Sequence, residues 1–214
     1  MGEKIKLNIT TSKTILDKNS ADENVIVEIN ENEQIQYVIL AVGNFNKDIT
    51  FNIRGENAEL EVIGICLLKN NEKTNLSTIQ SHKEKRSNST NLIKTILKDS
   101  SNFNFTGLIK IDKQAQQTNA FLTQNTLTLS DDTINHSVPS LEINADDVKA
   151  SHAATTSFID EESLYYLKSR GISQQESENL IIRGFIQTVI DKIEDKKIKK
   201  AVEEKVEEYF VSTI

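Results

Sequence analysis

The chain has 214 residues, 37% of them hydrophobic and 6% aromatic, and a formal charge of −7. A chain of this length can bury one core with a small appendage, and its acidic balance excludes the basic surface that nucleic acids and anionic membranes require. No apolar run reaches membrane-spanning length, and the N-terminus lacks the apolar region of a signal peptide, so we expect a cytoplasmic protein.

Cys66 is the single cysteine, which excludes an internal disulfide framework and a cysteine-rich metal site within one chain. It lies in the almost wholly apolar run 61–68, where a cysteine behaves as a small hydrophobic residue. A role in sulfur transfer would need an exposed thiol with a lowered pKa, and no cationic residue is near before Lys69. We therefore predict a buried, inert thiol.

Short strands are predicted along the first two thirds of the chain, because apolar and polar residues alternate with a period of two. The alternation is clearest at 4–9, 49–53 and 126–129. The predicted strands are Lys4–Ile9, Val25–Ile29, Ile35–Val42, Ile49–Arg54, Ala58–Leu68, Asn91–Leu97, Asn102–Asp112 and Ala120–Leu129.

Asparagine-rich segments separate these strands, at 30–32, 44–46, 55–57 and 70–71. Asparagine tolerates the left-handed backbone conformation, so it can form turns that the few glycines cannot. Many short strands at even spacing indicate a sandwich, a barrel or a β-solenoid. A weak recurrence at about 20–25 residues suits a solenoid, but no repeat motif decides between the three.

After Ser157 the period becomes helical. Asp160 is the expected N-cap of a helix over 161–170, and Gly171 supplies a left-handed stop. A second helix opens with the capping box Ser173-x-x-Glu176, and a third follows with apolar residues at helical spacing. The chain therefore reads as a β core over 1–157 and a helical region over 158–214.

Several short motifs occur in a specific order in the C-terminal half. They are Pro139-x-Leu141-Glu142-Ile143, Asp146-Asp147-Val148-Lys149, Ser151-His152, Ala154-Thr155-Thr156-Ser157, Tyr166-Leu167-x-Ser169-Arg170-Gly171-Ile172 and Gly184-Phe185. In this order they resemble the C-terminal region of the SufB/SufD family, the scaffold proteins of iron–sulfur cluster assembly. The resemblance implies a mainly β protein with a right-handed parallel β-helix core, a C-terminal α-helical appendage and no catalytic activity of its own.

The same resemblance suggests two histidines as metal ligands. His152 matches the family histidine at the scaffold-pair interface, where a nascent iron–sulfur cluster is held transiently rather than as a permanent cofactor. His136 resembles the histidine of a His-x-Val-Pro element, and a coil of about sixteen residues would bring it near His152. The alternatives are a histidine hydrogen-bonded within the last coil and an exposed turn histidine. His82 has no supporting context.

Three departures from the family pattern limit this site. Ala150 and Ala153 stand where SufD-like and SufB-like members carry cysteine and glutamate, and Asp131-Asp132-Thr133 replaces a stretch with an acceptor cysteine. Thiolate ligation needs a reactive cysteine. The remaining ligands would therefore come from a second SufB/SufD-like chain, or from a second copy of this one.

The helical region in the family docks the SufC ATPase, an ABC-type subunit. The resemblance places partner-binding residues at Tyr165, Tyr166, Arg170, Gly171 and Phe185, and aromatic and arginine side chains are typical interface anchors. Alternatively, the tyrosines and leucines of this helix cover the open end of the solenoid.

Two further functions stay open. One is an architectural paralogue that positions the ATPase but binds no metal, which the missing cysteine and glutamate favour. The other is a β-solenoid carbohydrate-active enzyme, which the low aromatic content and the lack of clustered carboxylates make the weakest alternative. The chain has no glycine-rich phosphate loop, so nucleotide energy would have to come from a partner.

Overall fold

The computed structural model describes residues 4–8, 13–18 and 23–211. Their strands form two six-stranded sheets in which neighbouring strands run parallel. Sheet A has the order β1-β3-β5-β7-β9-β11 and sheet B the order β12-β10-β8-β6-β4-β2. The strands are β1 Lys4–Asn8, β2 Lys13–Lys18, β3 Glu23–Ile29, β4 Gln34–Val42, β5 Phe45–Ile53, β6 Glu59–Leu68, β7 Lys73–His82, β8 Asn88–Leu97, β9 Asn102–Ile111, β10 Thr118–Thr128, β11 Ile134–Ile143 and β12 Val148–Phe158.

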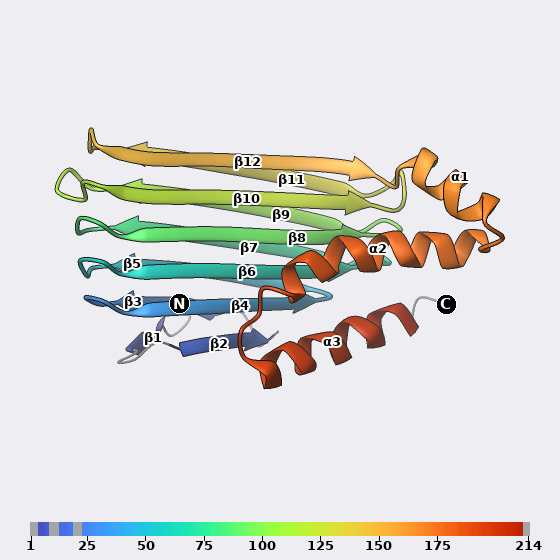
Figure 1. Cartoon of the computed structure of the whole chain (residues 1–214), viewed down its shortest axis with the longest axis horizontal. Coiled ribbons are helices and arrows are strands. Elements are labelled where there is room, and N and C mark those ends of the chain that lie inside the picture. The colour runs from blue at the N-terminus through green and yellow to red at the C-terminus, as the bar shows by residue number, and fades with distance from the viewer. Residues whose placement is uncertain (1–3, 9–12, 19–22, 212–214) are drawn as a thin grey trace.

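Successive strands alternate between the two sheets, so the chain winds as a parallel β-solenoid, which confirms the predicted fold class (Figure 1). The number of residues per coil increases along the chain. Lys4 lies beside Asn24 in the first coil, whereas Asn102 lies beside Ile134 in the last. The predicted recurrence of 20–25 residues therefore holds only for the first coils, and the strands lengthen from nine residues in β4 and β5 to ten and eleven in β11 and β12.

The space between the sheets is the first of two cores. Its aromatic contacts include Tyr37 edge-on to Phe51 and Phe103 stacked with Phe105. The middle coil is different, because the inward residues of β7 include Thr78, Gln80 and His82. This polar stretch explains why the sequence pattern missed β7. The predicted strands also omit β2, β11 and β12, and the predicted end of the first strand at Ile9 lies outside the described residues.

Left-handed residues recur at one corner of the solenoid. Asn32, Asn57, Arg86 and Gln117 precede β4, β6, β8 and β10 respectively, each with φ between 57° and 59°. The backbone N–H of Arg86 donates to the carbonyl of Gln116 on the next coil at 2.8 Å. The prediction that asparagines form the left-handed turns is confirmed for the earlier coils, while arginine and glutamine take the same conformation later.

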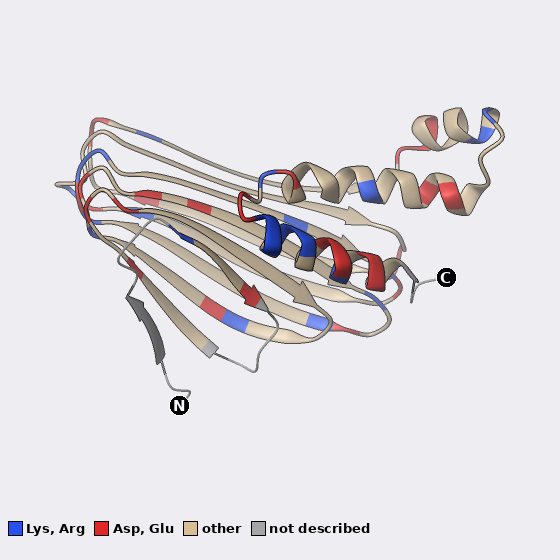
Figure 2. Ribbon diagram, turned by 60° about the horizontal axis from the view of Figure 1, so that its bottom comes forward, with Lys and Arg blue, Asp and Glu red and all other residues tan. Residues whose placement is uncertain are grey.

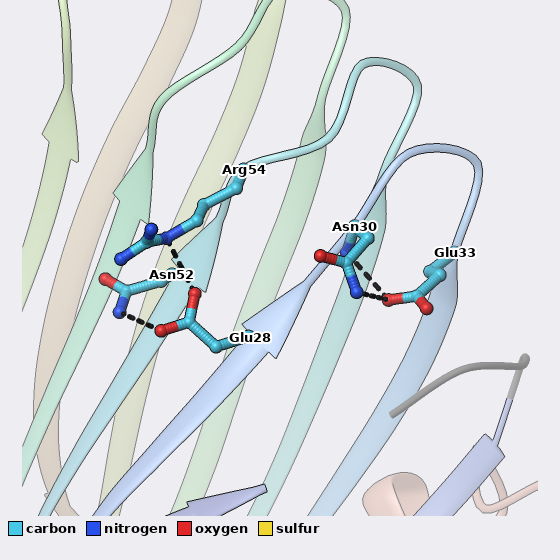
Figure 3. A network of polar contacts seen from close by, with 5 residues as sticks. All are labelled: Glu28, Asn30, Glu33, Asn52 and Arg54. Carbon is cyan, nitrogen blue, oxygen red and sulfur yellow. Dashed lines mark hydrogen bonds and ion pairs between the residues drawn. The ribbon is translucent and has the colours of Figure 1, made fainter. Parts of the chain in front are cut away.

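Polar side chains also link neighbouring coils on the outer face of sheet A (Figure 3). The carboxylate of Glu28 on β3 accepts from Arg54 at 2.7 Å and from the Asn52 amide at 3.1 Å. At the adjacent turn, Glu33 accepts from the backbone N–H of Asn30 at 2.7 Å. The Glu28 contacts thus link β3 to β5 of the next coil, whereas the Asn30–Glu33 contact is local and closes the turn between β3 and β4.

Three helices follow the last strand: α1 Glu161–Ser169, α2 Gln174–Ile190 and α3 Lys196–Val211. Helices α2 and α3 lie on the outer face of sheet B, where their apolar residues form the second core with strand residues such as Val38, Ile63 and Ile65 (Figures 1 and 2). Helix α1 extends beyond the strand ends. The helices therefore lie on the flank of the solenoid and do not cover its open end, contrary to the alternative considered above. None of the described helices is long and apolar enough to cross a membrane.

Candidate functional site

Helix α1 has no fully buried side chain, and only Leu164 and Leu167 are half-buried. Tyr165 and Tyr166 are 75% and 56% exposed. The helix is held by local capping instead: the Asp160 carboxylate accepts from the backbone N–H and the hydroxyl of Ser163, and these bonds lower the pKa of Asp160. A helix with two exposed tyrosines and no buried face is a surface available to a partner.

The turn after α1 sets the direction of the helix. Gly171 has φ of +86°, and its N–H donates to the carbonyl of Lys168 at 3.0 Å. Arg170 lies over the ring of Tyr166, 5.3 Å from its centroid. Of the predicted docking residues, Tyr165, Tyr166, Arg170 and Gly171 thus lie together on α1 and its stop.

Phe185 lies elsewhere. It is half-buried on α2 against sheet B, where the ammonium of Lys94 on β8 lies 4.1 Å from the centroid of its ring. Lys94 also donates to the carbonyl of Phe185 and to the hydroxyl of Thr188, both at 2.7 Å, and desolvation lowers its pKa. Phe185 therefore sits in the contact between α2 and the solenoid.

Gln36 makes a second attachment at the far end of α2. This buried side chain on β4 donates to the Lys192 carbonyl at 2.9 Å and accepts from the Glu194 N–H at 3.0 Å. On α3, the Tyr209 hydroxyl donates to the carbonyl of Leu68 at 3.1 Å. Polar bonds from three strands thus supplement the apolar contact, and α2 and α3 are fixed to sheet B.

A cavity of about 320 Å³ lies where α1, α2 and α3 meet the strand ends. Its apolar lining includes Leu164, Ile182 and Phe210, and its rim carries the carboxylates Glu161 and Glu178. Phe158, 61% exposed, also lines it. This composition matches a partner that inserts an apolar side chain and carries basic residues around it.

The last coil of the solenoid presents two open strand edges. Among the described strands, β11 pairs only with β9, and β12 pairs only with β10. Nearly all of β12 is exposed, and Ile134 and Val138 on β11 are 55% and 43% exposed. Unpaired backbone groups beside exposed apolar side chains are a template for pairing with another chain.

The two predicted metal ligands lie on these strands but in different settings. His136 pairs with Asn104 on the outer face of sheet A, whereas His152 pairs with the inward residue Leu122 and faces the open interior of the last coil. The structure does not bring them together, because the connection from β11 to β12 crosses between sheets and a full coil there takes about twice the sixteen residues expected. Within the described ranges, no group of three or more His, Cys, Asp or Glu residues could hold a metal ion.

The histidine that sequence reasoning set aside is the most enclosed of the three. His82 is fully buried, with Nδ1 2.7 Å from the Ser87 hydroxyl and Nε2 2.8 Å from the Ser89 hydroxyl. Ser87 donates to the Glu84 carbonyl and Ser89 accepts from the Gln80 amide, so a neutral ring protonated on Nδ1 satisfies the whole chain. Burial lowers the pKa of His82 to about 4. The period-two run Thr78, Gln80, His82 is the signal that could have placed it inward.

Cys66 is fully buried, as predicted, and burial raises the pKa of its thiol to about 12. A protonated, enclosed thiol cannot act as a nucleophile or a ligand in this fold.

These features define a class of protein: a parallel β-solenoid with an open edge and a helical arm, formed by α1, α2 and α3, that offers one free helix. The family described as "SUF system FeS cluster assembly, SufBD core domain" matches residues 3–185. The chain is 36% identical over 150 residues to the iron–sulfur cluster assembly protein SufD of Escherichia coli and 32% identical over 158 residues to SufD of Bacillus subtilis. It is 24% identical over 180 residues to SufB of B. subtilis.

The chain therefore belongs to the SufB/SufD family, as the motifs indicated. These alignments cover 70%, 74% and 84% of the chain but only 36% of each relative. The chain thus spans roughly a third of the length of the curated relatives it matches.

Proposed function

We propose that the chain is a non-catalytic scaffold subunit of a cytoplasmic iron–sulfur assembly complex. In this proposal α1 docks a SufC-like ABC ATPase, and the open edge of β11 and β12 meets a second scaffold chain. The observation that carries the proposal is α1, a capped helix with no buried residue and two exposed tyrosines.

The docking surface combines this helix with the cavity beside it. Tyr165 and Tyr166 would contribute large, rigid contact area, and an apolar side chain of the ATPase would enter the cavity next to Leu164. The rim carboxylates Glu161 and Glu178 favour a partner with basic residues around that anchor.

The open edge supplies the second contact. Two such edges, from two copies or from this chain and a cysteine-bearing relative, can pair through their free backbone groups. His152 faces the open interior of the last coil, so in such a pair its imidazole would lie at the seam. It would contribute one ligand to a nascent cluster whose other ligands come from the partner, with the cluster as cargo rather than a resident cofactor.

The attached arm suggests how nucleotide energy would reach this seam. ATP-driven dimerisation of the docked ATPase would move α1. Because Lys94 and Gln36 fix α2 and the following loop to sheet B, the movement would displace the solenoid as a body instead of bending the arm.

Co-expression with a SufC-like ATPase tests the docking. We expect a stable complex by size-exclusion chromatography with light scattering, and loss of at least tenfold in affinity for the double variant Tyr165→Ala/Tyr166→Ala with an unchanged melting temperature. Phe121→Ala is the matched control, since Phe121 is 40% exposed on sheet B away from the arm. Full binding by the tyrosine variant would refute docking through α1.

Metal content tests the seam separately. Complexes purified without oxygen should lose iron and sulfide when His152 is replaced by alanine and keep both when His136 is replaced. Equal loss in the two variants would contradict a specific role for His152.

A second candidate function is the architectural paralogue that docks the ATPase and binds no metal. Ala150 and Ala153, on either side of His152, favour it, because neither can ligate iron. A docked complex that never acquires iron, with any scaffold partner, would establish this role.

A further inference from the structure

The exposed face of α3 carries opposite charges at its two ends. Lysines occupy the start of the helix and glutamates its second half, as Figure 2 shows. Lys200 and Glu204, near the middle, are 77% and 65% exposed at their side chains. The exposed charged residues are Lys196, Lys197, Lys200, Glu204, Lys205, Glu207 and Glu208.

Helix stability does not account for this layout. The macrodipole favours acidic residues at a helix start and basic residues at its end, and α3 has no acidic residue in its first turn and no basic residue in its last. A lysine four residues before a glutamate also stabilises a helix less than the reverse order does. The start of α3 is satisfied instead by Asp195, which accepts from the N–H groups of Lys197 and Ile198 at 2.8 and 3.0 Å.

Contacts within the chain involve this face only in part, and Glu208 has a close partner within α3. Lys199 bonds to Asp191, and Arg183 pairs with Glu207 on the side next to α2. Lys205 pairs with its neighbour Glu208. The central pair, Lys200 and Glu204, is 3.9 Å apart and strongly exposed, so it contributes little.

Residues 196, 200, 204 and 208 form one stripe along α3, because residues four apart lie on the same side of a helix. The stripe reads lysine, lysine, glutamate, glutamate, and successive members are about 6 Å apart along the axis. It is symmetric in position and opposite in charge about residue 202. When two such stripes lie antiparallel, each lysine of one therefore lies opposite a glutamate of the other.

We infer that the α3 stripe binds a second copy of this chain, with the two helices antiparallel about a twofold axis beside residue 202. Lys200 then meets the partner's Glu204, and Lys196 meets the partner's Glu208, with the same pairs repeated by symmetry. The inference is independent of the proposed function, because it uses neither α1 nor the open edge.

Charge also explains why two copies would meet at this face. Two copies of a chain with a formal charge of −7 repel each other at most orientations. The stripe is locally balanced and complementary, so it is a place where two copies attract. The face has no apolar anchor, so the association is weak and depends strongly on salt.

Sedimentation velocity of the whole chain tests the inference, with charge reversals at the two ends of the stripe. The association of wild-type protein that depends on the stripe should be present at about 50 mM salt and lost at about 500 mM, where the Debye length is only a few ångströms. Lys196→Glu/Lys200→Glu and Glu204→Lys/Glu208→Lys should each lower the association constant at least tenfold. An equimolar mixture of the two should restore association, since an all-acidic stripe then meets an all-basic one.

The fourfold swap Lys196→Glu/Lys200→Glu/Glu204→Lys/Glu208→Lys is the control for folding. It keeps the stripe self-complementary and agrees with the macrodipole, so it should associate and melt at a higher temperature than wild type. Pairing through β11 and β12 depends on backbone bonds and is insensitive to these changes. Salt-independent association, unaltered association of the single-end variants, or failure of their mixture to associate would each overturn the inference.

Discussion

Helices α1 and α2 are separated by a turn of a few residues, yet the solenoid holds them differently. Helix α2 buries Ile182, Ile186 and Val189 against sheet B, whereas α1 buries nothing. Both begin with a capping side chain, so local chemistry forms the two helices equally well. Tertiary contacts then make one a structural element and leave the other free. Stability and partner binding are therefore separable in the arm.

The largest expected effect is on the buried face of α2. Ile186 is fully buried, and Ile186→Ala should lower the free energy of unfolding by about 3 kcal/mol through lost burial and a residual cavity. Leu180→Ala, at a site 49% exposed on the same helix, should change it by less than about 0.5 kcal/mol. Urea denaturation followed by circular dichroism measures both. Similar losses would mean that α2 is not held by this face.

Acid should lower the free energy of unfolding of the solenoid. A histidine in the unfolded chain takes up a proton near pH 6.5, whereas His82 in the fold does so only near pH 4. Between these values the unfolded state binds more protons, so stability is complete above about pH 6.5 and falls by about 3 kcal/mol as the pH drops to 4.

Denaturation at a series of pH values tests this slope. His82→Gln should remove most of it, while His136→Gln, at an exposed site, should keep it. A slope that persists in the His82 variant would assign acid sensitivity to other groups.

The Lys94 contact should give a smaller effect. Lys94→Met keeps the length of the side chain but loses two hydrogen bonds and the ring contact with Phe185, which should cost about 1–2 kcal/mol. Hydrogen exchange should rise in α2. Lys168→Met on α1, where the lysine bonds only to the exposed Gln174, should leave stability within about 0.5 kcal/mol.

Two glycines should give the smallest effects, with opposite signs. Gly171→Ala strains a residue at φ +86° and should cost about 1 kcal/mol, seen as fraying of α1. Gly184 lies inside α2 with open space where a Cβ would be, so Gly184→Ala should raise stability by about 0.5–1 kcal/mol. Thermal melts of the two variants should therefore shift in opposite directions.

Features determined by neighbouring residues could be predicted from the sequence. The N-cap at Asp160, the capping box of Ser173 and Glu176 and the left-handed Gly171 all depend on contacts within a few positions, and the structure confirms them. Strand β7 could not be found in this way, because its inward Gln80 and His82 bond to serines that follow the next turn.

The position of the arm depends on contacts between residues that are far apart in the sequence. Strands β4 and β6 are apolar almost throughout, a pattern typical of strands buried on both faces, and this was the available sign that helices lie on sheet B. The family motifs indicated His136 and His152 as ligands, but which way each side chain faces depends on the loop at 144–147. That loop moves the chain from one sheet to the other, so spacing along the chain does not carry over from β11 to β12.

The length of the last coil affects how copies of the chain can add to one another. Its strands β11 and β12 have ten and eleven residues, so two copies of this edge match in length and can stack with their free backbone groups paired. In such a stack each copy covers the β11 and β12 edge of the other, so the contact closes on itself as a pair.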